Sequence, residues 1–132
     1  MLFERRTVIA GAAAAALAGP AAAAEGATMY GLIGKMLAQP GQRDALVRLL
    51  LEGAGAMPGC LSYVVATDPA NPDAIWITEA WDSPESHAGS LRLPSVQATI
   101  AKARPLIAGF GERFETHPVG GLGLLQPSGK HF

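Results

Sequence analysis

Two short runs of β-branched and aromatic residues, separated by six turn-forming residues, constrain this chain more than any other feature. The runs are residues 61–67 and 74–81, and the sequence between them is Asp-Pro-Ala-Asn-Pro-Asp. Val, Ile, Tyr and Trp favour strands, whereas Pro, Asp and Asn favour turns. The two runs are therefore expected to form an antiparallel hairpin.

One strand and one helix are expected before this hairpin. Alternating residues over 29–38 end at Pro40-Gly41, which indicates a strand followed by a turn. From residue 42 to about 52, apolar residues recur at helical spacing, as at Leu46, Leu49 and Leu50. The second segment is thus predicted to be an amphipathic helix with a broad buried face.

A second helix and a last strand are expected after the hairpin. Ser83 and Pro84 have the residue types of an N-cap and a first helical position. The helix is expected to break at Leu93-Pro94, to resume after Ser95, and to present Ile107 on its apolar face. Residues 110–116 then alternate as a strand, with Phe110 and Phe114 interpreted as core residues.

The order strand, helix, strand, strand, helix, strand predicts an α+β protein with a ferredoxin-like βαββαβ fold. Its four-stranded antiparallel sheet would carry both helices on one face. The other face would stay bare in a monomer, although residues 61–65 and 75–77 are apolar on both faces of the sheet. A second subunit packed sheet against sheet is the simplest cover, so we expect a homodimer.

The first 24 residues are predicted to be a secretory signal. Arg5-Arg6 precedes an apolar run over 7–17, and Ala22-x-Ala24 has the small residues of a cleavage site. The arginine pair resembles a twin-arginine signal. The run is too short, and too rich in Ala and Gly, for a stable membrane anchor. We therefore expect export to the periplasm or the outside, with one domain over 25–119 and a tail over 120–132.

Charge and metal-ligand spacing exclude several function classes. The chain has 10 Lys and Arg against 11 Asp and Glu, with no basic cluster, which argues against nucleic-acid binding. The three histidines, His87, His117 and His131, have no ligand-like spacing to one another or to Cys60, so no metal site is expected. Cys60, the single cysteine, is interpreted as a buried strand residue that forms no internal disulfide.

Two sequence segments form a recognisable combination: Pro-Gly-Cys-Leu-Ser-Tyr at 58–63 and Ile-Thr-Glu-Ala-Trp-Asp-Ser-Pro-Glu-Ser-His at 77–87. Together they resemble the antibiotic biosynthesis monooxygenase family, including its quinol monooxygenase branch. Pro-Gly-Gln-Arg at 40–43 fits the same pattern, so the similarity covers about residues 29–116. The resemblance implies a dimeric α+β barrel with a pocket between sheet and helices. It also implies oxidation of quinol-like or phenolic substrates by O2 without metal or flavin.

The same scaffold hosts other chemistries, so function does not follow from the fold alone. Haem-degrading relatives carry an axial His and a Trp at positions that Ile100 and Ser90 occupy here, and the first strand has no Asn, which disfavours haem. Two further alternatives stay open: a non-enzymatic barrel that binds a small apolar ligand, and an isomerase that uses Arg92 or Arg104 to hold a carboxylate substrate. A proton acceptor inside the pocket would favour the monooxygenase over the binding protein.

Five residues are candidates for the site. Glu79 and Trp81 lie two apart on one strand and so share a face of the sheet. Glu79 is a candidate catalytic carboxylate, with a structural bridge to Arg104 or Arg113 as the alternative. Tyr63, Trp81 and Trp76 are candidates for substrate binding, because aromatic side chains can line a flat pocket. His87, one turn inside the second helix, is the candidate acid/base residue, because an imidazole can take a proton at neutral pH.

Overall fold

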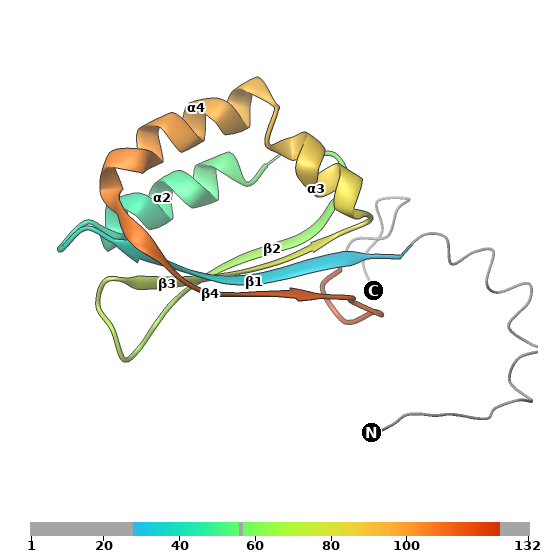
Figure 1. Ribbon diagram of the computed structural model, residues 1–132, viewed down its shortest axis with the longest axis horizontal. Coiled ribbons are helices and arrows are strands. Elements are labelled where there is room, and N and C mark those ends of the chain that lie inside the picture. The colour runs from blue at the N-terminus through green and yellow to red at the C-terminus, as the bar shows by residue number, and fades with distance from the viewer. Residues whose placement is uncertain (1–27, 56, 125–132) are drawn as a thin grey trace, which may run out of the picture.

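The computed structural model describes residues 28–55 and 57–124, which form one four-stranded sheet with helices on one side (Figure 1). The strands are β1 (Tyr30–Ala38), β2 (Cys60–Thr67), β3 (Ala74–Trp81) and β4 (Ile107–Thr116). The helices are α2 (Arg43–Gly53), α3 (Pro84–Ser90), α4 (Pro94–Ala103) and the 3-10 helix η1 (Arg104–Leu106). The predicted signal at residues 1–24 lies outside the described residues, as does the tail beyond residue 124.

The sheet has the strand order β2-β3-β1-β4, and each neighbouring pair is antiparallel. This order confirms the ferredoxin-like βαββαβ fold. Figure 1 shows α2, α3 and α4 on the same side of the sheet. The side of the sheet that carries the helices is called the inner face below, and the opposite side is called the outer face.

The core lies between α2 and the inner face. Leu46 of α2, Ile75 of β3 and Ala103 of α4 are buried there. Arg43, in the first turn of α2, donates hydrogen bonds from Nη1 to the carbonyl oxygens of Asn71 (2.9 Å) and Asp68 (3.3 Å). The helix is thus tied to the turn between β2 and β3, which fixes the helix over the hairpin.

Strand alternation decides which side chains can reach the helices. On β3, Ile75, Ile77, Glu79 and Trp81 have odd numbers and lie on the inner face, whereas Trp76 and Thr78 lie on the outer face. The inner face is apolar near α2 and becomes polar toward the end of β3. Glu79 and Trp81 therefore lie on the face of the sheet that carries the helices.

The last strand differs from the prediction. β4 begins at Ile107, so this residue lies on the strand and not on the helix face where it was expected. Pro105 has no backbone N–H to continue the helix, and the chain makes one 3-10 turn before it extends. The assignment of Phe110 and Phe114 to the core was also wrong in the single chain, because they are 71% and 53% exposed. Helices cover neither residue.

The chain after β4 passes over one end of the outer face. A Cβ on Gly31 of β1 would overlap Oγ1 of Thr116 and lie 3.0 Å from Pro118, so a larger residue there would force these side chains to shift. Leu124 is buried against Leu61 and Ala80. In the described part of the chain, no helix has the length and apolar character needed to cross a membrane.

Candidate active site

The start of α3 is held against the turn before β2. Ser83 caps the helix, because its Oγ accepts a hydrogen bond from the backbone N–H of Ser86 at 3.1 Å. Gly59 has φ +86°, and a Cβ there would lie 2.5 Å from the side chain of Ser86. The backbone N–H of Asp82 donates to the carbonyl of Gly59 at 2.8 Å. The predicted N-cap at Ser83 is confirmed. The contacts that Gly59 makes with Ser86 and Asp82 place α3 at the end of β3.

His87 projects from α3 between two aromatic rings. Its ring centroid lies 5.3 Å from that of Tyr30 and 5.4 Å from that of Trp81, the latter in an edge-to-face arrangement. Its side chain is only 19% exposed. Packing of this kind limits the imidazole to a narrow range of orientations.

The carboxylate of Glu79 faces His87. The Nε2 atom of His87 lies 3.9 Å from Oε1 of Glu79, whose side chain is 17% exposed. The same Oε1 accepts a hydrogen bond of 2.8 Å from the indole N–H of Trp81. The alternative structural bridge is wrong among the described residues, since Arg113 pairs with Glu115 and Arg104 forms no ion pair with Glu79. Glu79, Trp81 and His87 therefore form one connected group.

Tyr63 of β2 lies opposite Glu79 across the β2–β3 pair and lines the same space. Burial raises the pKa of its hydroxyl well above the ordinary tyrosine value, and the negative charge of Glu79 raises this pKa further. The hydroxyl therefore keeps its proton at neutral pH and can donate a hydrogen bond. Cys60, half-buried at the start of β2, also has a raised pKa, chiefly because of burial.

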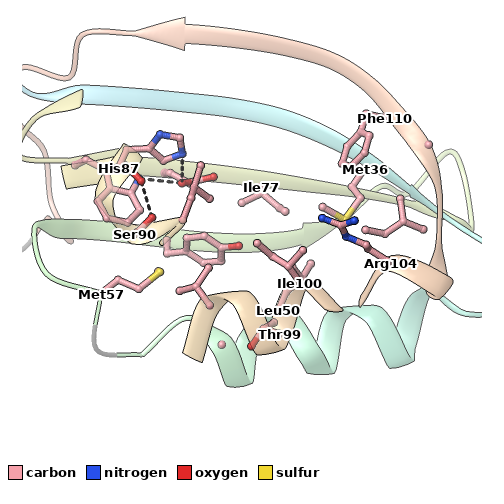
Figure 2. Close-up of a pocket in the computed structure, with 18 of the residues that line it drawn as sticks. Met36, Leu50, Met57, Ile77, His87, Ser90, Thr99, Ile100, Arg104 and Phe110 are labelled. Atoms are coloured by element: carbon pink, nitrogen blue, oxygen red, sulfur yellow. Dashed lines mark hydrogen bonds and ion pairs between the residues drawn. The ribbon is translucent and has the colours of Figure 1, made fainter. Parts of the chain in front are cut away.

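One cavity of about 680 Å³ lies between the inner face and the helices (Figure 2), and it is lined by Tyr63, Glu79, Trp81 and His87 among others. His87 and Ser90 lie at one end in Figure 2, and Arg104, Met36 and Phe110 lie at the other. The walls between them are mostly apolar and include Met57, Ile77, Leu50, Val96 and Ile100. A cavity of this volume with few polar groups is typical of sites for small organic molecules.

The structure brings four of the five candidate residues together: Tyr63, Glu79, Trp81 and His87. It does not place Trp76 with them, because Trp76 is on the outer face of β3, where its indole N–H donates to Oδ2 of Asp68 at 3.0 Å. The prediction that Trp76 binds substrate is therefore wrong for this cavity. His117 is exposed beyond β4, and His131 lies outside the described residues. Within residues 28–55 and 57–124, no group of three or more His, Cys, Asp or Glu side chains is arranged to hold a metal ion.

Sequence reasoning missed part of the cavity wall. Ser90 is buried, and its Oγ donates to the carbonyl of His87 at 2.6 Å. Met36 and Met57 reach the cavity from β1 and from the turn before β2. No local signal marked these residues, because their roles depend on how α3 and α4 cross the sheet. From the sequence alone, Arg104 is a candidate only as a bridge partner of Glu79 or as the carboxylate anchor of an isomerase, and the structure places it in the wall of this cavity.

A ferredoxin-like sheet with helices on one face, and with a mostly apolar cavity that contains a partly buried imidazole and carboxylate, defines a small α+β protein. The sequence model of the family described as antibiotic biosynthesis monooxygenase matches residues 29–102. This match covers more than half of the chain. The chain therefore belongs to the antibiotic biosynthesis monooxygenase family.

One similar solved structure is a protein from Chloroflexus aurantiacus, described as a suspected antibiotic biosynthesis monooxygenase. It is 72% identical, the match covers 73% of this chain and 98% of that chain, and the TM-score is 0.71. No curated protein matches the chain.

More distant structures share the fold. A suspected antibiotic biosynthesis monooxygenase from Nitrosomonas europaea is 14% identical over 70% of this chain and 89% of that chain, with a TM-score of 0.59. One from Caulobacter crescentus is 19% identical over 69% of this chain and 88% of that chain, also with a TM-score of 0.59. At such identities the likeness concerns the arrangement of strands and helices alone.

Proposed function

We propose that this protein is a monooxygenase that oxidises a quinol or another hydroxyaromatic molecule with O2, the substrate itself supplying the electrons. One observation carries the proposal: a partly buried imidazole and carboxylate, His87 and Glu79, stand 3.9 Å apart at one end of an apolar cavity. Membership in the antibiotic biosynthesis monooxygenase family also supports the proposal. The cavity holds a proton acceptor, and this feature favours an enzyme over a passive binding protein.

The first step is removal of the proton from the substrate hydroxyl. His87 is the base, because a neutral imidazole can take this proton at neutral pH. Glu79 faces the imidazole and stabilises the positive charge that the imidazole acquires. Trp81 holds the carboxylate in place through its indole N–H. Glu79 and Trp81 are thus positioning residues, and His87 is the catalytic residue.

The second step joins O2 to the substrate. The aromatic anion gives one electron to O2, and the resulting radical and superoxide combine at a ring carbon that bears hydrogen, forming a C–O bond. The O–O bond of this hydroperoxide breaks as the ring carbon loses its hydrogen, which leaves a carbonyl and releases water. One O2 is consumed for each quinone formed, with one oxygen atom in the product and one in water. The proton held by His87 returns to the departing oxygen.

Tyr63 and the apolar wall assist these steps. The hydroxyl of Tyr63 remains protonated and can donate a hydrogen bond to the oxygen of the substrate anion. Because the anion is more reactive when few waters surround it, the apolar residues Ile77, Ile100 and Met57 favour its reaction with O2. Tyr63 is thus the hydrogen-bond donor to the substrate anion, and His87 is the base.

Oxygen uptake tests the proposal. The purified protein is mixed with a panel of one-, two- and three-ring hydroquinones and naphthols, and O2 consumption is followed with an electrode while the products are identified by mass spectrometry. We expect at least one compound to consume one O2 per molecule and to gain one oxygen atom from ¹⁸O2. If every compound in the panel binds and none is consumed above the protein-free rate, the protein is a binding barrel and the proposal is wrong.

A further inference from the structure

The two ends of the cavity differ in charge and in contact with solvent. Glu79 and His87 form the more buried end, with side chains 17% and 19% exposed. Arg104 also lines the cavity, but it is an exposed residue, so it stands where the cavity meets solvent. Figure 2 shows Arg104 beside Met36 and Phe110, well separated from His87. The cavity is therefore an elongated apolar space with a carboxylate at one end and a guanidinium at the other.

The guanidinium of Arg104 has no partner among the residues that the structure describes. The ion pairs found there join Lys35 with Glu112, His87 with Glu79, and Arg113 with Glu115. Arg104 is also the only Lys or Arg that lines the cavity in this part of the chain. An arginine presents planar N–H donors that match a carboxylate in two parallel hydrogen bonds. An unpaired arginine at the rim of an apolar cavity is thus available to a ligand.

We propose that Arg104 binds a carboxylate of the substrate, so that the preferred substrates are elongated hydroxyaromatic acids with the hydroxyl and the carboxylate at opposite ends. The inference rests on the proposed function for the assignment of the hydroxyl end to His87. It adds a specificity-determining residue and a substrate class to that function.

Charge fixes the direction in which such a ligand lies. A carboxylate placed at the buried end would meet Glu79 at close range and would lose most of its hydration, and both effects oppose binding. The same carboxylate at Arg104 meets an opposite charge and keeps part of its contact with water. A neutral hydroxyl loses less on entering the buried end, where Tyr63 and His87 can hydrogen-bond to it.

The walls near Arg104 suit an aromatic acid with a single negative charge. Phe110 is 71% exposed and lines the cavity at this end, where it offers a ring face to a flat ligand. One guanidinium balances one carboxylate, whereas a phosphate dianion would leave a charge unpaired beside this apolar wall. The ligand class is thus an aromatic monocarboxylate rather than a phosphorylated compound.

A pair of isosteric probes tests the inference without turnover. The probes are 6-hydroxy-2-naphthoate and 6-hydroxy-2-naphthamide, which differ only in the charge of the group opposite the hydroxyl. Binding to the purified protein is measured by calorimetry under nitrogen, so that no O2 is present to react. A charge-assisted hydrogen bond is stronger than a neutral one, so we expect the carboxylate to bind about 10-fold tighter or more.

Two variants assign this preference to Arg104. Arg104→Met keeps an apolar stem and removes the charge, and it should bring the two affinities together by weakening only the carboxylate. Arg48→Met makes the same change of net charge on an exposed position of α2 that does not line the cavity, and it should keep the preference. Circular dichroism reports whether each variant is folded, and Arg104→Gln replaces Arg104→Met if the latter is not.

Equal affinity of the unaltered protein for the two probes would overturn the inference. It would also be overturned if Arg48→Met lost the preference for the carboxylate probe to the same extent as Arg104→Met. The proposed function fails by a different observation, the absence of O2 uptake with both neutral and carboxylated hydroquinones. A protein that prefers the carboxylate but consumes no O2 would keep the anion site and lose the oxygenase assignment. A protein that oxidises neutral hydroquinones and shows no preference for the acid would keep the oxygenase assignment and lose the anion site.

Discussion

Oε1 of Glu79 accepts a hydrogen bond from the indole N–H of Trp81 at 2.8 Å and lies 3.9 Å from Nε2 of His87. The indole therefore holds the carboxylate oxygen that faces the imidazole. The 3.9 Å separation suits an ion pair and is too long for a hydrogen bond. Strand β3 supplies both Glu79 and Trp81, and α3 supplies the imidazole, so the junction of β3 and α3 determines the geometry of the site.

His87→Ala should lower kcat for O2 uptake by roughly 100-fold or more, because a positioned acid/base group typically contributes at least this factor. The cavity walls stay in place, so the affinity for substrate should change much less than kcat. Steady-state rates of O2 consumption measure both quantities. His117→Ala is the matched control, because His117 is exposed beyond β4, and its rate should equal that of the parent.

The contrary result for His87 is also informative. A folded His87→Ala protein that oxidises every substrate at the parental rate would show that this imidazole has only a structural role. The proton acceptor would then be Glu79 or a group of the substrate. Circular dichroism and sedimentation confirm that the variant keeps its fold and mass.

Glu79→Ala should destabilise the protein by about 1–3 kcal/mol, because it leaves the indole N–H of Trp81 without its acceptor in a side chain that is 1% exposed. Glu79→Gln keeps a carbonyl oxygen in this position, so its free energy of unfolding should stay closer to that of the parent. Urea denaturation of the three proteins measures the difference. If Glu79→Ala is as stable as the parent, the hydrogen bond contributes nothing to folding.

The hairpin and the start of α3 could be predicted from sequence because their signals are local. The turn chemistry of residues 68–73 and the cap at Ser83 act within a few residues, and β3 has the predicted bounds Ala74–Trp81. The odd positions of β3 also placed Glu79 and Trp81 on one face. Most of the candidate site could therefore be predicted from local signals, without knowledge of tertiary contacts.

The start of β4 and the rim of the cavity could not be predicted in the same way. Ile107 has the spacing of a helix face, and only the 3-10 turn at Arg104–Leu106 moves it to a strand. Phe110 follows the alternation of a core strand, but α4 ends before it can cover the ring, so the ring stays exposed. Both outcomes depend on the length of α4 relative to the sheet, which no local pattern encodes.

We propose that two chains pair through the outer face of the sheet. Val64, Thr78, Ile33 and Phe114 are successive register partners and form a row across all four strands on this face. Val64 and Phe114 are each 53% exposed in the single chain. Three of the four residues are apolar, and an apolar patch that reaches across a whole sheet is rarely left in water. The unaltered protein should therefore sediment with twice the chain mass at micromolar concentration.

Val64→Lys should shift this protein to the monomer, because the dimer interface would have to bury the new charge. Leu51→Lys is the control, since Leu51 is 57% exposed on α2, on the other side of the sheet, and its variant should remain dimeric. Sedimentation equilibrium measures both. A parent protein that is monomeric and soluble at this concentration contradicts the proposal directly.

The free energy of unfolding should fall as the pH rises above about 10, and Tyr63 should be responsible for part of this fall. Burial and the charge of Glu79 raise the pKa of its hydroxyl in the folded chain, so the unfolded chain loses this proton first. Below pH 10 both states keep the proton, and the contribution does not vary. Above it, one such group lowers the stability by up to about 1.4 kcal/mol per pH unit.

Tyr63→Phe removes this group, so urea denaturation between pH 9 and 11 should show a shallower fall than in the parent. Tyr30→Phe is the comparison. The hydrogen bond to Glu115 also raises the pKa of Tyr30, but this bond is exposed and solvent weakens its effect on stability. The slope for Tyr30→Phe should stay near that of the parent. Identical slopes in Tyr63→Phe and the parent would mean that Tyr63 ionises at its ordinary pH in the folded protein. Burial of the hydroxyl and the charge of Glu79 would then make no contribution to the pH dependence of folding.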